Sequence, residues 1–194
     1  MENLRELLIE ELKDLYSAEK QIVKALPKII RGAASQELKV AITEHLEVTK
    51  AQVTRLDEVF GIVGEKPRAK HCKGMEGLLA EGSDMIEEEE RSPTLDAAMI
   101  GAAQKVEHYE IAAYGTARAM AEKLGMAQAA ELLGETLAEE EQADTKLTEV
   151  AEGLYGEVET GEEEGGETED GEGSATQGTS RKIAMKKKTA TKKG

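Results

Sequence analysis

The chain has 194 residues, with 40 acidic and 25 basic side chains and a formal net charge of −15 at pH 7. This length suits one domain with a sizeable core plus additional segments. The negative charge argues against sequence-independent binding of nucleic acid by the folded part. A single cysteine excludes an internal disulfide and indicates a reducing compartment.

The composition favours helices over strands, with three prolines, no tryptophan and one phenylalanine. The first residues alternate charge with leucine and lack the apolar centre of a secretory signal. No stretch approaches the roughly 20 apolar residues of a membrane span. We therefore expect an all-α, cytoplasmic protein without a membrane span.

The first half of the chain predicts two long helices. The first covers about residues 2–31 and stops before Gly32. The second begins after Ser35, a plausible N-cap, and fades over residues 61–64. The link between them is short, so the two helices should form an antiparallel hairpin.

The second half predicts another helical hairpin. Ser92 and Pro93 suit an N-cap followed by the first helical position, and this helix ends at Gly125. The fourth helix covers about residues 127–154. The long connection over residues 65–91 contains a short apolar-bearing stretch. The order of short, long and short links predicts a ferritin-like four-helix bundle with a long crossover between the second and third helices.

The end of the chain differs sharply from the rest. Nine acidic residues lie within residues 156–180, and seven basic residues follow within residues 181–194. Few apolar side chains are available here to offset the entropy of ordering the backbone. We predict a folded domain over residues 1–155 and a disordered tail, acidic and then lysine-rich, over residues 156–194.

Near its middle, the apolar stripe of each predicted helix is interrupted by residues that can bind a cation. In the second helix the stripe repeats at alternating spacings of four and three, which is the seam of a helix bundle. In the fourth helix the seam passes through either Glu140 or Glu141. We favour solvated positions for Glu139 and Glu140, as is usual for glutamates in Glu-rich helices. The interrupting residues are Glu19; His45, Thr49 and Gln52; Glu107 and Glu110; and Glu141 and Asp144.

These side chains should converge, because antiparallel helices of similar length align at their centres. Buried carboxylates are costly unless a cation meets them. Oxygen-rich ligation with one imidazole suits Fe or Mn better than Mg or Ca, and five carboxylates could hold two ions. Thr49 and Gln52 are expected to donate hydrogen bonds to ligands, and Tyr114 either does the same or is an ordinary buried tyrosine. The predicted metal ligands are Glu19, His45, Glu107, Glu110, Glu141 and Asp144.

EEEQAD over residues 139–144 resembles a metal-binding helix of the ferritin-like superfamily. Four other segments occur in a specific order: KDLYSAEKQ, EHLE with Thr49 and Gln52 after it, GLLAEG and QKVEHYEIAAYG. Through them, residues 1–155 resemble the bacterial YciE/YciF-type stress-protein family. That family belongs to the ferritin-like superfamily, with rubrerythrins and manganese catalases as neighbours. The resemblance implies a ferritin-like bundle, a role in stress responses and a homodimer.

The resemblance also assigns site positions. Glu19 corresponds to the first-helix glutamate, and Glu107 and Glu110 match the third-helix glutamates of the rubrerythrin-like pattern. Glu141 with Asp144 stands where Glu-x-x-His is expected. The second helix offers Thr49 and Gln52, with His45 one turn earlier, in place of Glu-x-x-His. Two imidazoles of the pattern are thus replaced.

Two functions from different classes follow. The first is a dinuclear Fe or Mn carboxylate protein that acts on peroxide or dioxygen during stress. The second is a dimeric structural or protective stress protein whose site is vestigial or only stabilising, which the two replaced imidazoles favour. Contact of the lysine-rich end with nucleic acid is a less favoured third reading.

Overall fold

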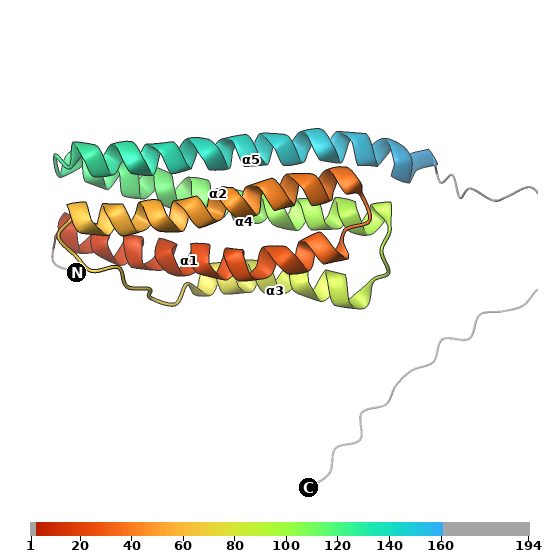
Figure 1. Cartoon of the computed structure of the whole chain (residues 1–194), viewed down its shortest axis with the longest axis horizontal. Coiled ribbons are helices and arrows are strands. Elements are labelled where there is room, and N and C mark those ends of the chain that lie inside the picture. The colour runs from red at the N-terminus through yellow and green to blue at the C-terminus, as the bar shows by residue number, and fades with distance from the viewer. Residues whose placement is uncertain (1–2, 161–194) are drawn as a thin grey trace, which may run out of the picture. The chain divides into compact units, whose positions relative to one another are not determined.

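The computed structural model describes residues 3–160, which form five helices and no strand (Figure 1). This confirms the predicted all-α class. The prediction of a disordered tail falls mostly on residues 161–194, which lie outside the described residues. The helices are α1 (Leu4–Gly32), α2 (Gln36–Ile62), α3 (Lys73–Glu88), α4 (Pro93–Lys123) and α5 (Ala127–Thr160).

The four long helices each contact two of the others. α1 packs on α2 and α4, and α5 packs on the other sides of α2 and α4. α3 connects α2 to α4 and lies along α1 and α4 (Figure 1). Buried side chains fill the interior between the four long helices, from Leu8 near one end to Leu154 near the other.

Polar caps define where the helices begin. The side-chain oxygens of Ser35 and Ser92 accept hydrogen bonds from the backbone N–H groups of Leu38 and Leu95. Both caps satisfy N–H groups that have no partner within the helix. Both were predicted from sequence and are confirmed.

Two glycines mark where helices end. Gly64 and Gly125 follow α2 and α4 with φ angles of 75° and 72°. A residue with a side chain is strained in this left-handed region, whereas glycine is not. The predicted ends of these helices are therefore confirmed.

Two elements differ from the prediction. The apolar-bearing part of the connection is a regular helix, α3, which Cys72 caps and in which Met75 is the only fully buried residue. A helix with so little burial has a weak sequence signal. α5 continues to Thr160, beyond the predicted end near residue 154. Among the residues of α5 whose side chains the structure describes, Leu154 is the last buried one. A docked helix can gain further backbone hydrogen bonds without a new nucleation cost.

Asp96 ties the α1–α2 link to α4. Its carboxylate is fully buried and accepts hydrogen bonds from the backbone N–H groups of Ala34 and Ser35. Replacing Asp96 with alanine removes the charged acceptor of these hydrogen bonds, so we expect a loss of about 2–3 kcal/mol in unfolding free energy. Urea unfolding of Asp96→Ala measures this loss. Asp84→Ala, at an exposed position in α3, is the control; equal midpoints for the two variants would contradict the prediction.

The core near the α4–α5 turn is rich in small residues. Ala117 and Ala121 of α4 are buried with Ala129 and Ala130 of α5 in one apolar cluster. Helix axes can approach more closely where the contacting side chains are small.

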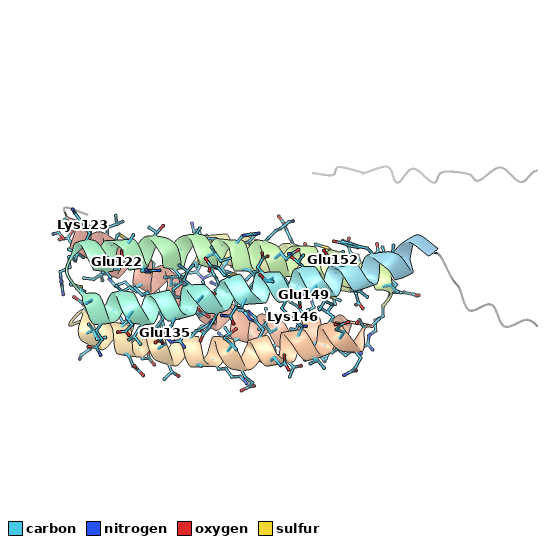
Figure 2. The ribbon with its side chains drawn as sticks, turned by 90° about the horizontal axis from the view of Figure 1, so that it is seen from above. Glu122, Lys123, Glu135, Lys146, Glu149 and Glu152 are labelled. Carbon is cyan, nitrogen blue, oxygen red and sulfur yellow. The ribbon has the colours of Figure 1, made fainter. Side chains whose placement is uncertain are left out.

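The outer surface is highly charged. Glu135, Lys146 and Glu149 are exposed on α5, with further charged side chains around them (Figure 2). Among the described residues, no helix is both long enough and apolar enough to cross a membrane.

Candidate metal centre

Side chains from the four long helices meet in the interior. His45 of α2, Glu107 and Glu110 of α4 and Glu140 of α5 each place one potential ligand atom within 4.8 Å of the others. Glu19 of α1 is fully buried, and its charge acts on Glu107 and Glu110. We call these five residues the carboxylate cluster. The predicted convergence at one depth is therefore confirmed for Glu19, His45, Glu107 and Glu110.

Glu19 is held by Tyr114. The hydroxyl of Tyr114, itself fully buried, donates a hydrogen bond to Glu19 Oε1. Burial, with a smaller contribution from Glu140, raises the pKa of Glu19 well above its ordinary value. Of the two readings of Tyr114, the structure favours the hydrogen-bond donor to a cluster carboxylate.

Burial also disfavours the ionised form of three other glutamates in the cluster, Glu107, Glu110 and Glu140. They are 2%, 1% and 0% exposed. Burial first, and then the neighbouring carboxylates, raise the pKa values of Glu107 and Glu110 well above the ordinary range. Burial raises the pKa of Glu140 to about 7. Without a cation, the cluster therefore retains protons near neutral pH.

His45 is neutral at the same pH. Burial lowers its pKa to about 4. Its Nε2 atom lies 3.4 Å from Glu107 Oε1, with 10% of the His45 side chain exposed. Because the imidazole is uncharged, this contact is not an ion pair at pH 7. A neutral imidazole is the form that binds metals.

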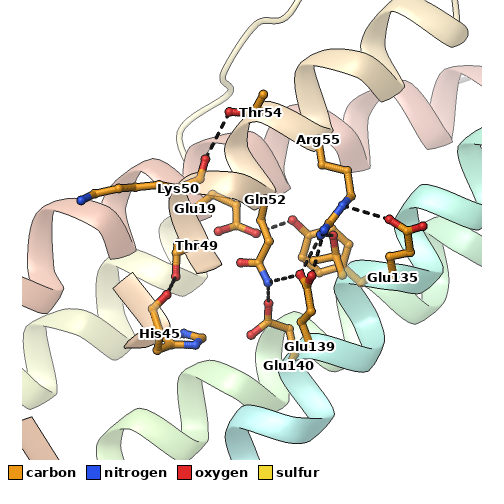
Figure 3. Close-up of polar contacts among 12 residues, drawn as sticks. Glu19, His45, Thr49, Lys50, Gln52, Thr54, Arg55, Glu135, Glu139 and Glu140 are labelled. Atoms are coloured by element: carbon orange, nitrogen blue, oxygen red, sulfur yellow. Dashed lines mark hydrogen bonds and ion pairs between the residues drawn. The ribbon is translucent and has the colours of Figure 1, made fainter. Parts of the chain in front are cut away.

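A second polar group lies beside the cluster. The two terminal guanidinium nitrogens of Arg55 donate hydrogen bonds to the two carboxylate oxygens of Glu139, at 2.7 and 2.8 Å (Figure 3). Burial would raise the pKa of Glu139, but hydrogen bonds from Arg55 and Gln52 outweigh it and lower that pKa. Gln52 Nε2 donates to both Glu139 and Glu140. Glu139 is thus an ionised link between Arg55 and the cluster.

Within the described part of the chain, every buried side-chain atom that lacks a hydrogen-bond partner belongs either to the cluster or to Gln52 beside it. Native proteins leave few such atoms, because each one costs free energy. Most of these atoms are carboxylate oxygens, and His45, Glu107, Glu110 and Glu140 each place one potential ligand atom within 4.8 Å of the others. The atoms without a partner are Glu19 Oε2, His45 Nε2, Gln52 Oε1, Glu107 Oε2, both carboxylate oxygens of Glu110, and Glu140 Oε2.

In α5 the structure selects a different glutamate from the predicted one. Glu140 is fully buried, so its interpretation as a solvated residue is wrong. Glu141 is exposed and does not reach the cluster. The physical reason is the helical turn of about 100° per residue, which lets only one of two adjacent side chains face the core. The spacing of four and three from Leu133 and Leu137 leads to Glu140 and was the available signal.

Two other predicted residues lie at the margin. Asp144 is 23% exposed and accepts a hydrogen bond from Gln104 rather than joining the cluster. Thr49 is buried, but its hydroxyl donates to the backbone oxygen of His45, one turn earlier. Thr49 therefore supports the ligand-bearing helix, not a ligand side chain. No sequence pattern marks Arg55 and Glu139, since their pairing depends on how α2 and α5 face each other.

The sequence matches the family described as "Domain of unknown function (DUF892)" over residues 3–159. It is 46% identical to Protein YciF of Escherichia coli over 152 residues, which are 78% of this chain and 92% of that protein. The crystal structure of the E. coli stress protein YciF matches with a TM-score of 0.78 and 44% identity, covering 80% of this chain and 99% of that one.

Two further solved structures are similar. YcfI from Rhodopseudomonas palustris, for which a structural role has been suggested, has a TM-score of 0.74 and 44% identity, covering 76% of this chain and 94% of its own. A protein from Xanthomonas campestris pv. campestris has a TM-score of 0.66 at 21% identity, covering 81% of this chain and 97% of its own, and shows a shared fold alone. The chain is a member of the DUF892 family, within which it is a homologue of YciF.

Proposed function

We propose that the chain is a ferritin-like metal-binding protein that holds a pair of Fe or Mn ions and acts on peroxide or dioxygen during stress. In this proposal α1, α2, α4 and α5 form the four-helix bundle, and the segment with α3 is the crossover. The stress role draws on the description of its E. coli relative as a stress protein.

The observation that carries the proposal is the set of buried atoms without partners in the carboxylate cluster. Four carboxylates and one neutral imidazole, buried together, would be a costly arrangement for stability alone. The same residues suit a cation, because oxygen-rich ligation with one nitrogen matches Fe or Mn. Glu19, His45, Glu107, Glu110 and Glu140 would hold the ions.

The protein's own residues have definable parts in this function. Tyr114 fixes the orientation of Glu19, and Gln52 fixes that of Glu140. The burial of the cluster excludes bulk water from the reacting groups. Bound metal would supply the electron transfer, because none of the side chains described at the site carries out that chemistry alone.

Metal uptake tests the proposal directly. Purified full-length protein is incubated with excess Fe²⁺ without oxygen, or with Mn²⁺, and is then desalted. Mass spectrometry is expected to show about two retained ions per chain, since four ionised carboxylates balance the charge of two divalent ions. A variant carrying Glu107→Gln and Glu110→Gln should retain none. Retention of no Fe or Mn by a folded wild-type protein would overturn the proposal.

The second candidate is a dimeric structural or protective stress protein with a vestigial or purely stabilising site. The role suggested for YcfI of R. palustris favours it. Thermal unfolding and peroxide assays separate the two functions. Metal that raises the melting temperature, while peroxide turnover stays at the rate of free metal, would select the second candidate. Sedimentation of the purified protein measures the homodimer that either candidate includes.

The proposal places the protein in the cytoplasm, where a reducing environment suits its single cysteine, Cys72. Nucleic-acid contact through residues 181–194 remains the less favoured alternative. Equal retention on DNA by the full chain and by a chain lacking residues 180–194 would exclude this alternative.

A further inference from the structure

Gln52 differs from the other polar residues around the carboxylate cluster. Gln52 is 1% exposed. Its amide nitrogen has hydrogen-bond partners, whereas its amide oxygen has none among the described residues. Nε2 donates hydrogen bonds to Glu139 Oε2 at 3.0 Å and to Glu140 Oε1 (Figure 3). Oε1 is buried and has no partner among the described residues.

The amide of Gln52 has only one acceptable orientation. Turning it over would place Oε1 against oxygens of both Glu139 and Glu140, which are acceptors when ionised. Glu139 cannot relieve this conflict by moving, because Arg55 holds both of its oxygens and also donates to Thr136. The ion pair between Arg55 and Glu139 therefore fixes the orientation of the Gln52 amide. In this orientation the amide nitrogen faces Glu139 and the amide oxygen points away from it.

We propose that Gln52 is a neutral oxygen ligand of the metal pair, and that Arg55 and Glu139 are positioning residues that present its carbonyl oxygen. This inference rests on the proposed function, and it assigns Gln52 a direct role in place of the hydrogen-bonding role expected from sequence. The carbonyl oxygen of an amide is an established ligand type for hard cations.

The neutrality of Gln52 has a consequence for the charge of the site. Glu19, Glu107, Glu110 and Glu140 bring four negative charges when ionised, which two divalent ions balance. Gln52 and His45 then complete the coordination without adding charge. A glutamate at position 52 would supply a similar oxygen together with a fifth negative charge, beside Glu139 and Glu140.

Two substitutions at position 52 separate a ligand from a hydrogen-bond donor. Gln52→Leu removes both the oxygen and the N–H donors, so we expect Mn²⁺ affinity to fall by about tenfold or more. Gln52→Glu keeps an oxygen ligand but cannot donate to Glu139 or Glu140. If Gln52 is a ligand, Gln52→Glu keeps affinity within a few-fold of wild type. If Gln52 serves only as a donor, Gln52→Glu binds as weakly as Gln52→Leu, and the inference is wrong.

The measurement is Mn²⁺ titration calorimetry on the full chain at pH 7.5, with Gln142→Leu as the control at an exposed position in α5. Arg55→Met, which frees Glu139, should lower affinity in the wild-type background but not in Gln52→Leu. Equal binding by wild type and Gln52→Leu would overturn this inference and leave the proposed function standing. A wild type that binds no Mn²⁺ or Fe²⁺ would overturn both.

A crystal structure of the Mn²⁺-loaded wild type tests the inference even if a variant fails to fold. Gln52 Oε1 is expected at coordination distance from an ion located by its anomalous scattering. An ion held by the carboxylates, with Gln52 Oε1 outside coordination distance, would overturn the assignment.

Discussion

Replacing Glu140 with glutamine is expected to weaken Mn²⁺ or Fe²⁺ binding by more than about tenfold, whereas the same change at Glu141 should leave binding unaltered. Glu140 is fully buried in the carboxylate cluster, and Glu141 is exposed on the same turn of α5. The two variants are a matched pair, because they make the same chemical change at neighbouring positions of one helix. Metal content after desalting and titration calorimetry measure the difference.

The metal-free Glu140→Gln protein should fold as well as wild type. Burial raises the pKa of Glu140 to about 7, so the wild-type side chain is already protonated in part at neutral pH. Glutamine is close in shape to that protonated form, which limits the cost of the change. If Glu140→Gln and Glu141→Gln lost metal equally, or if neither variant lost any, the cluster would not be the site that holds the metal.

The stability of the metal-free protein should fall as the pH rises from 6.5 to 8. Glu140 has a pKa of about 7 in the folded state against an ordinary value of 4.5, and Glu19 and Glu110 are raised well above that value. Over this range the folded protein holds protons that the unfolded chain has released. Each proton of difference lowers the unfolding free energy by about 1.4 kcal/mol per pH unit.

His45 opposes this trend only at lower pH. Its pKa falls from 6.5 to about 4 on folding. The contribution of His45 to the unfolding free energy is therefore fully present above pH 6.5 and is lost as the pH falls towards 4. The window above pH 6.5 therefore isolates the carboxylates. Urea unfolding in the presence of a chelator measures the slope.

Bound metal should reverse the trend. A cation takes the place of the protons, so the stabilisation by saturating Mn²⁺ is expected to grow between pH 6.5 and 8. Glu110→Gln, which removes one of the raised carboxyl groups, should flatten the slope of the metal-free protein. Glu141→Gln should leave that slope unchanged. A metal-free protein whose stability rises with pH over this window would contradict the raised pKa values of the cluster.

Local patterns were sufficient to predict much of the helical framework. Ser35 and Ser92 are side-chain caps, and Gly64 and Gly125 adopt the left-handed backbone that ends a helix. These features depend on residues close together in sequence, so they can be predicted from one chain. α3 escaped prediction because it buries only Met75 fully, and a helix with so narrow an apolar face is not marked by periodicity.

The candidate site was predictable where a polar residue interrupts a clear apolar seam. Glu19, His45, Glu107 and Glu110 meet this condition, and all four lie in the cluster. Between Glu140 and Glu141 the spacing favours Glu140 as the buried residue, whereas the general tendency of glutamates to be solvated favours an exposed Glu140. That tendency does not hold for a residue on the seam.

Contacts between distant segments could not be predicted in the same way. The pairing of Arg55 with Glu139 depends on the rotation of α2 and α5 about their axes. The orientation of the Gln52 amide depends on that pair in turn. Neither Arg55 nor Glu139 interrupts an apolar pattern, so only the folded arrangement identifies this pair.

The small residues near the α4–α5 turn also affect how far apart the carboxylate groups of α4 and α5 lie. Ala117 and Ala121 lie in one apolar cluster with Ala129 and Ala130, and bulk added there would act as a wedge between the two helices. Glu107 and Glu110 are on one of these helices and Glu140 is on the other. The distance between the carboxylate oxygens of the two helices therefore depends partly on alanine methyl groups that are not members of the carboxylate cluster.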